Sequence, residues 1–313
     1  EGFEATLKIE NEESLVLTDL GAEVKIYDAD GNDAGSLLAI GDPALTQFTA
    51  LDGSGVLTAG KTGTARWLIV PFAEAAPLQE TTYYVGGILN YSMGDTKVTI
   101  PLAPVEITVH PQPELHLEYY HQRDVFSDDP WTDEIEPSRP YEMAVLVRNT
   151  GVGDARKLKI ISGQPEIAEN EKGLLIDFQL IGHEIDGQPK SPALTAEFGD
   201  LPGGDWAVAR WWMTSTLQGQ FTEYKATLSH VSPLGDPRLS QIKDVVIFEL
   251  IHAVEVASEL AFLTNDEVDA IDLPDAIHLQ DGTELPVAPV DETAAVLTGA
   301  LTPTQLEVTL ETP

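Results

Sequence analysis

The sequence contains no cysteine among its 313 residues. This absence excludes disulfide frameworks, thiol nucleophiles and zinc sites built on cysteine ligands. Positive charge is also scarce: 17 lysine and arginine residues stand against 52 aspartate and glutamate residues, and the formal net charge is −35. A surface with this charge repels nucleic acids and anionic membranes, so we expect no nucleic-acid partner. Long apolar runs are missing too, and we therefore expect no membrane insertion.

Sequence signatures of catalysis are absent as well. The chain has no Gly-x-Ser-x-Gly element, no glycine-rich phosphate loop and no dinucleotide fingerprint. Paired carboxylates are common, but in so acidic a chain no single pair stands out as a glycosidase dyad. We therefore predict that the protein is not an enzyme. The chain begins Glu1-Gly-Phe-Glu, and we interpret it as a processed protein or as a piece of a longer one.

Strand patterns dominate what is present. Apolar residues make up 42% of the chain, enough for real cores, and turns rich in glycine, aspartate and proline separate segments in which apolar and polar residues alternate. The clearest alternation lies in Phe3–Ile9, Ala22–Tyr27, Thr82–Tyr91, Val98–Val109, Tyr141–Arg148, Lys157–Ile161 and Phe221–His230. Short helical turns are indicated only at Ala73–Ala76, Ile167–Lys172 and Glu255–Leu263. The sequence therefore predicts an all-β protein built of sandwiches.

One stretch of sequence occurs twice. Leu57–Trp67 aligns without gaps on Leu201–Trp211, and both copies end in Ala-Arg-Trp, 144 residues apart. Each copy continues through an apolar stretch, a polar loop and two further strand-like segments. A shared ordered series of this kind predicts a duplicated β module. We expect Trp67 and Trp211 to point into the cores, and the arginine before each to pair with a carboxylate on the opposite face.

The repeat suggests where the domains begin and end. Two prolines in His110–Pro113 favour an extended linker. We predict a first sandwich over 1–112, a second over 113–254 with an insertion around Ile167–Leu194, and a remainder over 255–313. The remainder ends in a strand-like segment, Leu306–Leu310. It is either the start of an incomplete third module or a small appendage packed on the second.

A family resemblance rests on the segment that starts at Asn149. Asn149-Thr-Gly-Val-Gly153, followed by alanine and an alternating strand, resembles the corner between the second and third strands of immunoglobulin-like modules of the CARDB-like and fibronectin type III-like kinds. Asn11–Tyr27 is a looser counterpart in the first module. Such modules occur in tandem in large secreted bacterial surface proteins. The resemblance implies tandem immunoglobulin-like β-sandwiches with a non-catalytic role in spacing, assembly or adhesion, in an extracellular or cell-surface protein.

Two acidic segments are candidate calcium sites, because hard cations prefer several carboxylate oxygens and close like charges are costly unless neutralised. Asp124–Pro137 holds six carboxylates, and the predicted ligands are Asp124, Asp128, Asp129 and Asp133; the alternative is a solvated acidic loop. In the second segment the candidates are Asp28, Asp30 and Asp33. That segment lacks the glycine and glutamate positions of an EF-hand loop, and a hairpin turn explains the same residues.

Two kinds of partner are predicted. The terminal strand-like segments, Phe3–Ile9 and Leu306–Leu310, are candidates for pairing with another copy or a neighbouring module by strand addition. The rival hypothesis is a carbohydrate-binding module, in which Trp131, Trp206 and Trp212 stack on a polysaccharide.

Overall fold

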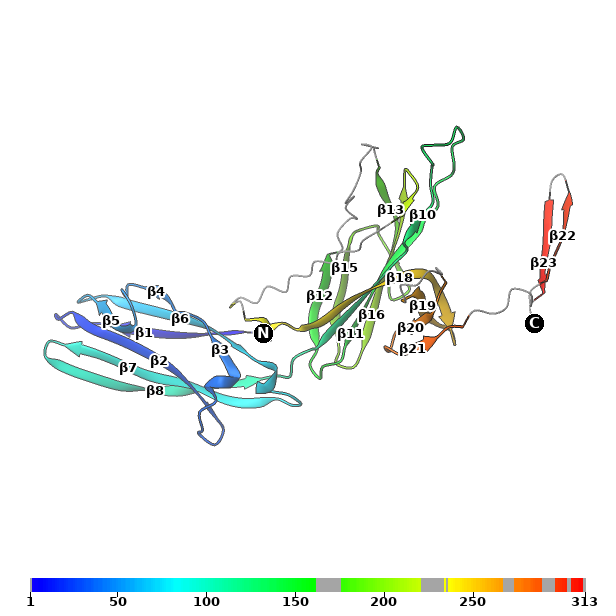
Figure 1. Cartoon of the computed structure of the whole chain (residues 1–313). Coiled ribbons are helices and arrows are strands. Elements are labelled where there is room, and N and C mark those ends of the chain that lie inside the picture. The colour runs from blue at the N-terminus through cyan, green and yellow to red at the C-terminus, as the bar shows by residue number, and fades with distance from the viewer. Residues whose placement is uncertain are drawn as a thin grey trace.

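The computed structural model describes residues 2–161, 176–220, 234, 236–266 and 273–288, together with the backbone of 296–302 and 305–311. Within these ranges the chain folds into strands and three single turns of 3-10 helix (Figure 1). The prediction of an all-β sandwich protein is confirmed. The predicted strand Phe221–His230 and the predicted helical turn Ile167–Lys172 lie outside the described residues.

The first sandwich consists of two sheets that pack face to face. Its elements are β1 (Phe3–Glu10), β2 (Leu17–Asp28), η1 (Gly35–Leu37), β3 (Leu38–Ile40), β4 (Ala44–Thr46), β5 (Asp52–Leu57), β6 (Thr62–Pro71), η2 (Ala73–Ala75), β7 (Thr81–Met93) and β8 (Thr96–Val109). One sheet has the order β1-β6-β3, with β4 also on β6, and the other has the order β5-β2-β7-β8. Their inner faces share one apolar core, which includes Leu20, Ile26 and Trp67.

The second sandwich is built around a nine-stranded sheet. Its elements are β9 (Leu115–His121), β10 (Asp124–Val125), β11 (Tyr141–Asn149), β12 (Ala155–Ile161), β13 (Phe178–Ile185), β14 (Gln188–Lys190), β15 (Thr195–Leu201), β16 (Trp206–Ser215), β17 (Gly219–Gln220), η3 (Pro237–Leu239), β18 (Ile242–Val256), β19 (Glu259–Asn265), β20 (Ala276–Leu279) and β21 (Glu284–Pro286). The sheet order is β14-β13-β16-β11-β9-β18-β19-β20-β21, and β12-β15 forms a separate pair. β12 and β15 pack on the inner face of the large sheet, where Trp211 is fully buried.

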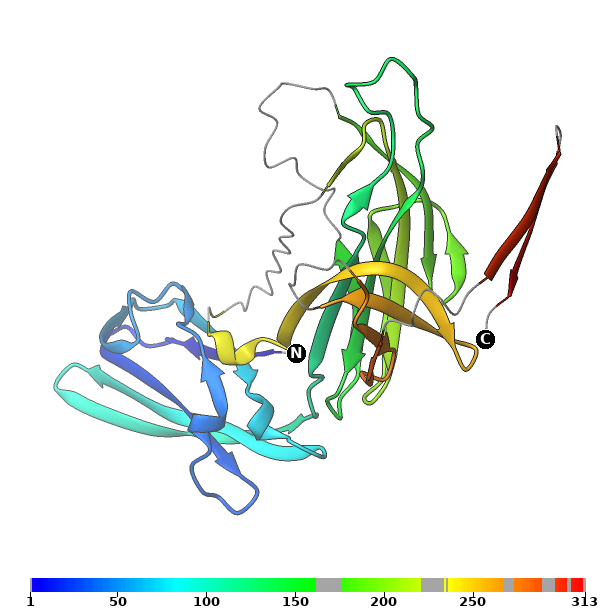
Figure 2. The same ribbon diagram turned by 45° about the vertical axis from the view of Figure 1, so that its right-hand side comes forward.

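The outer face of the large sheet is also covered. β18 is a long, curved strand that arches across the sheet in Figure 2, and β19 to β21 follow it. Tyr120 of β9 stacks on Phe262 of β19 with ring centroids 4.0 Å apart, and both side chains are fully buried. The large sheet therefore has a core on each face. The prediction of a helical turn over Glu255–Leu263 is wrong, since this segment forms the end of β18 and most of β19. Pairing of β19 with both β18 and β20 outweighs the local helix propensity.

The predicted boundary between the second sandwich and the remainder can be compared with the strands of the structure. The boundary at 254/255 falls inside β18, and β19 to β21 continue the sheet of the second sandwich. This pairing corresponds to the alternative in which part of 255–313 is a small appendage packed on the second sandwich. The last two strands, β22 (Val296–Thr302) and β23 (Gln305–Glu311), form a separate two-stranded antiparallel sheet.

Both sandwiches contain the same hydrogen-bond arrangement around a buried asparagine. Asn11 directly follows β1 and Asn149 is the last residue of β11, and each side-chain amide donates to three backbone carbonyls. The acceptors are Leu15, Leu57 and Thr58 for Asn11, and Gly153, Leu201 and Pro202 for Asn149. Three further hydrogen bonds match. Each side-chain oxygen accepts the backbone N–H of the residue two positions later. The backbone of Asn11 donates to the carbonyl of Lys61 and accepts from the N–H of Gly60, and the backbone of Asn149 does the same with Asp205 and Gly204.

The strand register agrees with this arrangement. Ala5 lies opposite Trp67 in the pair β1–β6, and Met143 lies opposite Trp211 in the pair β11–β16. Residues of β1 and the loop after it match residues 138 positions later, and residues of β6 and the turn before it match residues 144 positions later. These two offsets relate all six hydrogen bonds and the strand register of the two sandwiches. Trp67 and Trp211 are 7% and 0% exposed, so the prediction that both point into a core is confirmed.

Two contacts connect the two sandwiches, one from the linker and one from η3. Gln112 donates from its side-chain amide to the carbonyl of Pro71 at the end of β6, over 2.7 Å. The guanidinium of Arg238 lies 4.1 Å from the ring centroid of Phe72, a cation–π contact between η3 and the first sandwich. These contacts restrict the linker beyond what its two prolines do.

Candidate functional site: an open groove in the first sandwich

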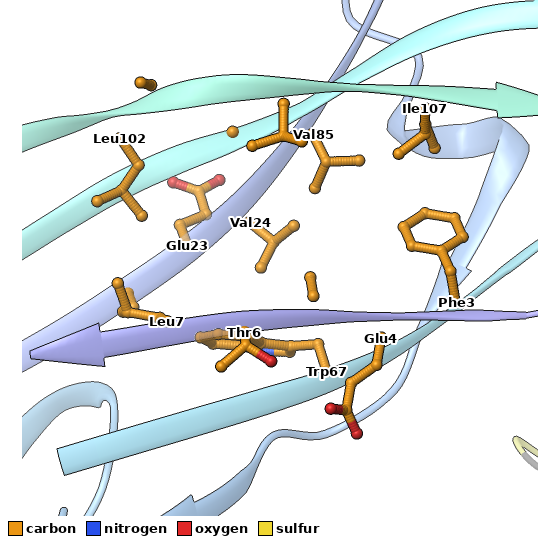
Figure 3. Close-up of a pocket in the computed structure, with 15 residues that line it drawn as sticks. Phe3, Glu4, Thr6, Leu7, Glu23, Val24, Trp67, Val85, Leu102 and Ile107 are labelled. Atoms are coloured by element: carbon orange, nitrogen blue, oxygen red, sulfur yellow. The ribbon is translucent and has the colours of Figure 1, made fainter.

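The first sandwich is open along one side. β1 is the edge strand of its sheet and β8 is the edge strand of the facing sheet, and a groove of about 370 Å³ lies between them (Figure 3). Figure 3 shows Phe3 and Leu7 of β1 on one side and Val85, Leu102 and Ile107 of β7 and β8 on the other. Val24 lies between them, and Trp67 lies under β1 at the base. The lining is mostly apolar and also includes Glu4, Thr6 and Glu23.

The second sandwich has a strand at the corresponding place. β9 pairs antiparallel with β11, which corresponds to β1 by the 138-residue offset, and it pairs parallel with β18 on its other side. Its residues Leu115, Leu117 and Tyr119 belong to the inner core. In the first sandwich the described residues place no strand beside β1 other than β6. The groove therefore lies where β9 lies in the second sandwich.

The missing neighbour changes how well the matching side chains are buried. In β11 the inward side chains Tyr141, Met143, Val145 and Val147 are 2%, 6%, 0% and 0% exposed. The matching side chains of β1, at residues 3, 5, 7 and 9, are all only half-buried. Because transfer of apolar surface from water is worth about 25 cal/mol per Å², covering β1 would be favourable.

The two edges of the groove differ in their capacity to pair. β8 contains Pro101 and Pro104, which cannot donate backbone hydrogen bonds and are typical of protected edges. β1 contains no proline, and its outward side chains include Lys8, which forms an ion pair with Glu10. β1 is therefore the edge of the groove that can accept another strand.

The arginine of each Ala-Arg-Trp repeat pairs with carboxylates, as predicted. Arg210 binds Glu142 of β11 and Glu184 of β13, and its guanidinium lies 4.7 Å from the ring centroid of Trp212. These side chains are 12–18% exposed. Among the described residues the ion pair of Arg66 is with Glu4, at 3.7 Å, and both side chains are more than half exposed.

We expect Arg210→Ala to lower the free energy of unfolding of the second sandwich by about 2 kcal/mol, because two poorly solvated carboxylates lose their cation. The matched variant Arg66→Ala removes an exposed pair and is expected to cost less than about 1 kcal/mol. Urea denaturation of both variants measures the difference. Equal effects would contradict this account of the Arg210 cluster.

A buried histidine makes stability depend on pH. His121 ends β9, is 7% exposed, and contacts the carbonyl of Gln122 through Nδ1 at 2.8 Å. Burial lowers the pKa of His121 to about 4 from an ordinary value of 6.5. The folded chain therefore holds this imidazole neutral in a pH range where the unfolded chain protonates it.

The sign of the effect follows from this lowered pKa. The contribution of His121 to stability is fully present above pH 6.5 and is lost as the pH falls from 6.5 towards 4, by up to about 3 kcal/mol. We expect urea midpoints to fall over this range, and to fall less in His121→Gln. A variant with the same pH profile as the parent would contradict the assignment.

The acidic loop does not gather its predicted calcium ligands. Asp128 accepts the backbone N–H of Glu136 at 3.1 Å, Asp129 accepts that of Trp131 at 3.0 Å, and Asp124 accepts from the side chain of Gln220. Among the residues that the structure describes, no three histidine or acidic side chains are grouped as a metal site requires, and Asp133 joins no such group. Calcium binding stays a prediction, which thermal melts with calcium and with a chelator test directly.

The second calcium candidate is a hairpin turn. Asp28 accepts the backbone N–H groups of Asp30 and Asn32, and Asp33 accepts that of Gly35. The hydrogen bond from the Asn32 side chain, with those from the backbone, lowers the pKa of the Asp28 carboxyl. Gly31 has φ +82°, the left-handed conformation that such a turn requires. The carboxylates of Asp28 and Asp33 are thus used within the turn, which favours the hairpin interpretation.

The three candidate sugar-binding tryptophans do not form one platform. Trp131 is 68% exposed on the acidic loop. Trp206 donates from its indole N–H to Gln280 at 2.8 Å, and Trp212 stacks on Arg210. Trp206 and Trp212 lie six residues apart on β16, about 20 Å at the rise of an extended strand.

Sequence reasoning named Phe3–Ile9 as a terminal strand able to pair by strand addition, but it missed the groove beside it. The groove depends on β1 having β6 as its single neighbour among the described strands, and no residue of the lining has an unusual sequence pattern.

No helix among the described residues is long and apolar enough to cross a membrane. Neither a family model nor a curated protein matches the sequence. Among solved structures, the chain is similar to the secreted serine protease VesC from Vibrio cholerae, at 11% sequence identity and a TM-score of 0.22. The match covers 72% of this chain and 48% of that chain, so the chain spans about half the length of this neighbour.

Proposed function

We propose that the protein is a non-catalytic structural module of an extracellular or cell-surface protein, built as a tandem repeat of immunoglobulin-like sandwiches, and that it assembles through strand edges. The observation that carries the proposal is the edge of β1 that no described strand pairs with, beside an apolar groove. An exposed strand edge of this kind is a ready site for addition of another strand. The shared asparagine arrangement and strand register support the repeat.

Sedimentation velocity of the full chain over a range of concentrations tests the assembly. We expect species larger than a monomer to grow with protein concentration, and more readily at higher salt, because each copy carries a net charge of −35. A single monomeric species at every concentration and salt would overturn self-assembly as the function.

Polysaccharide binding is the second candidate, and the exposed side chain of Trp131 is the observation that favours it. It predicts that iodide quenches a fraction of the tryptophan fluorescence and that a polysaccharide relieves this quenching. Trp131→Ala is the control, because it removes the exposed indole. Quenching that no polysaccharide relieves would exclude this candidate.

A further inference from the structure

We propose that the groove of the first sandwich is the acceptor for β23 of a second copy of this chain, which pairs antiparallel with β1. The inference rests on the proposed function and names the two surfaces that would meet. The second sandwich provides the template, since β9 pairs antiparallel with β11 and buries its apolar residues in the inner core.

The sequence of β23 fits the place that β9 occupies in the second sandwich. Leu306, Val308 and Leu310 alternate with polar residues, as Leu115, Leu117 and Tyr119 do in β9. In an antiparallel pair, directly opposite residues share a face of the sheet. A strand with this alternation would therefore place three apolar side chains over the groove and its polar residues on the outer face, beside Thr6 and Lys8.

Charge selects one register. With Val308 opposite Leu7, Glu307 lies opposite Lys8, the only basic residue of β1. Thr309 then lies opposite Thr6, a favourable cross-strand pair, and Glu311 lies opposite Glu4, which already contacts Arg66. Moving the strand by two residues toward Asn11, so that Val308 lies opposite Ile9, keeps the apolar face inward but places Glu307 opposite Glu10. Moving the strand by two residues the other way, so that Val308 lies opposite Ala5, leaves the neutral Gln305 opposite Lys8. Of the three registers, the proposed one is the register that places a carboxylate opposite Lys8.

The hairpin of β22 and β23 has an edge to offer. The two strands pair only with each other among the described strands, and a two-stranded hairpin alone is marginally stable in water. β23 can keep β22 on one side and add β1 on the other. Figures 1 and 2 both show the hairpin on the far side of the second sandwich from β1, an arrangement that suits pairing between copies. Repetition of this head-to-tail contact gives an open chain of molecules.

Cysteine cross-linking tests the contact without background, because the chain has no cysteine of its own. Thr6→Cys and Thr309→Cys are made as separate single variants, mixed and oxidised. We expect a disulfide-linked dimer, because opposite residues of a strand pair lie within the 7 Å between Cα atoms that a disulfide allows. The matched control uses Thr298→Cys in place of Thr309→Cys. Thr298 lies on β22, directly opposite Thr309, so in the proposed complex it is two strand spacings, about 10 Å, from residue 6 of the other copy.

A second measurement uses non-cysteine variants. Val105 lines the groove from β8 and is 65% exposed, so Val105→Asp is expected to preserve the fold while lowering the association constant at least about tenfold. Val308→Asp, on the donor strand, is expected to do the same. Ile135→Asp, on the acidic loop at 90% exposure, is the control and is expected to leave association unchanged.

The outcomes separate this inference from the proposed function. Assembly that persists in both aspartate variants, without the cross-link between residues 6 and 309, would overturn the groove as acceptor and leave assembly through another edge. A double variant that carries Thr6→Cys and Thr309→Cys in one molecule tests the alternative: a cross-link within that molecule, with none between the mixed single variants, would overturn the role of a second copy. Absence of assembly and of any cross-link would overturn both proposals.

Discussion

Replacing Trp211 with alanine is expected to lower the free energy of unfolding of the second sandwich by about 3–5 kcal/mol. The indole is fully buried in the inner core, donates its N–H to the carbonyl of Ala193 at 2.8 Å, and stacks on His183 with ring centroids 5.5 Å apart. The substitution leaves a cavity and an unsatisfied carbonyl. Urea denaturation measures the loss, and hydrogen exchange by mass spectrometry assigns it to peptides of one sandwich.

Trp67→Ala is the matched variant, because Trp67 has the same place in the first sandwich. Its indole lines the open groove, so solvent already reaches one side and we expect a smaller loss, about 2–3 kcal/mol. Faster exchange is expected in peptides of β6 and its partners. An effect of Trp211→Ala below about 1 kcal/mol would show that this indole isn't the centre of the core.

Replacing Asn149 with alanine is expected to cost about 3–4 kcal/mol, because several buried backbone groups lose their partners at once. Its side-chain amide donates to three carbonyls, and its side-chain oxygen accepts the N–H groups of Glu114 and Gly151. Asn149→Asp keeps the shape and the acceptor but removes the donor, and it places a negative charge against three carbonyls. We expect it to be at least as destabilising as alanine.

Asn11→Ala is the control within the same chain. Asn11 has the three matching carbonyl acceptors and the N–H of Glu13, but among the described residues no hydrogen bond matches the one from Glu114. The expected loss is therefore smaller than for Asn149→Ala, and it falls on the first sandwich. Thermal melts followed by hydrogen exchange distinguish the two. Variants of Asn11 that leave the first sandwich unaffected would contradict a shared role for the two asparagines.

The local elements were largely predictable from the sequence. Period-two alternation located β1, β7, β8 and β11 within a few residues, although β11 is buried on both faces. The Ala-Arg-Trp repeat located Trp67 and Trp211 in the cores and Arg210 beside its carboxylates. These features depend on short-range patterns that the sequence records directly.

The long-range pairing was not predictable in the same way. β18 pairs parallel with β9 and antiparallel with β19, and nothing in Ile242–Val256 specifies which neighbours it takes. The groove has the same origin, since it follows from which strand lies beside β1. The acidic loop shows the reverse case: its carboxylates suggested a cation, but backbone N–H groups of the same loop use them.

The parallel pairing of β9 with β18 determines how the second sandwich would respond to a pulling force. Tension between Leu115, at the start of β9, and Val256, at the end of β18, acts along the two strands in opposite directions. The hydrogen bonds between them are evenly spaced and would be loaded together in shear. β19 to β21 lie after β18, so tension from the C-terminal side reaches them first, and each hairpin can open in turn before the shear-loaded pair carries the tension.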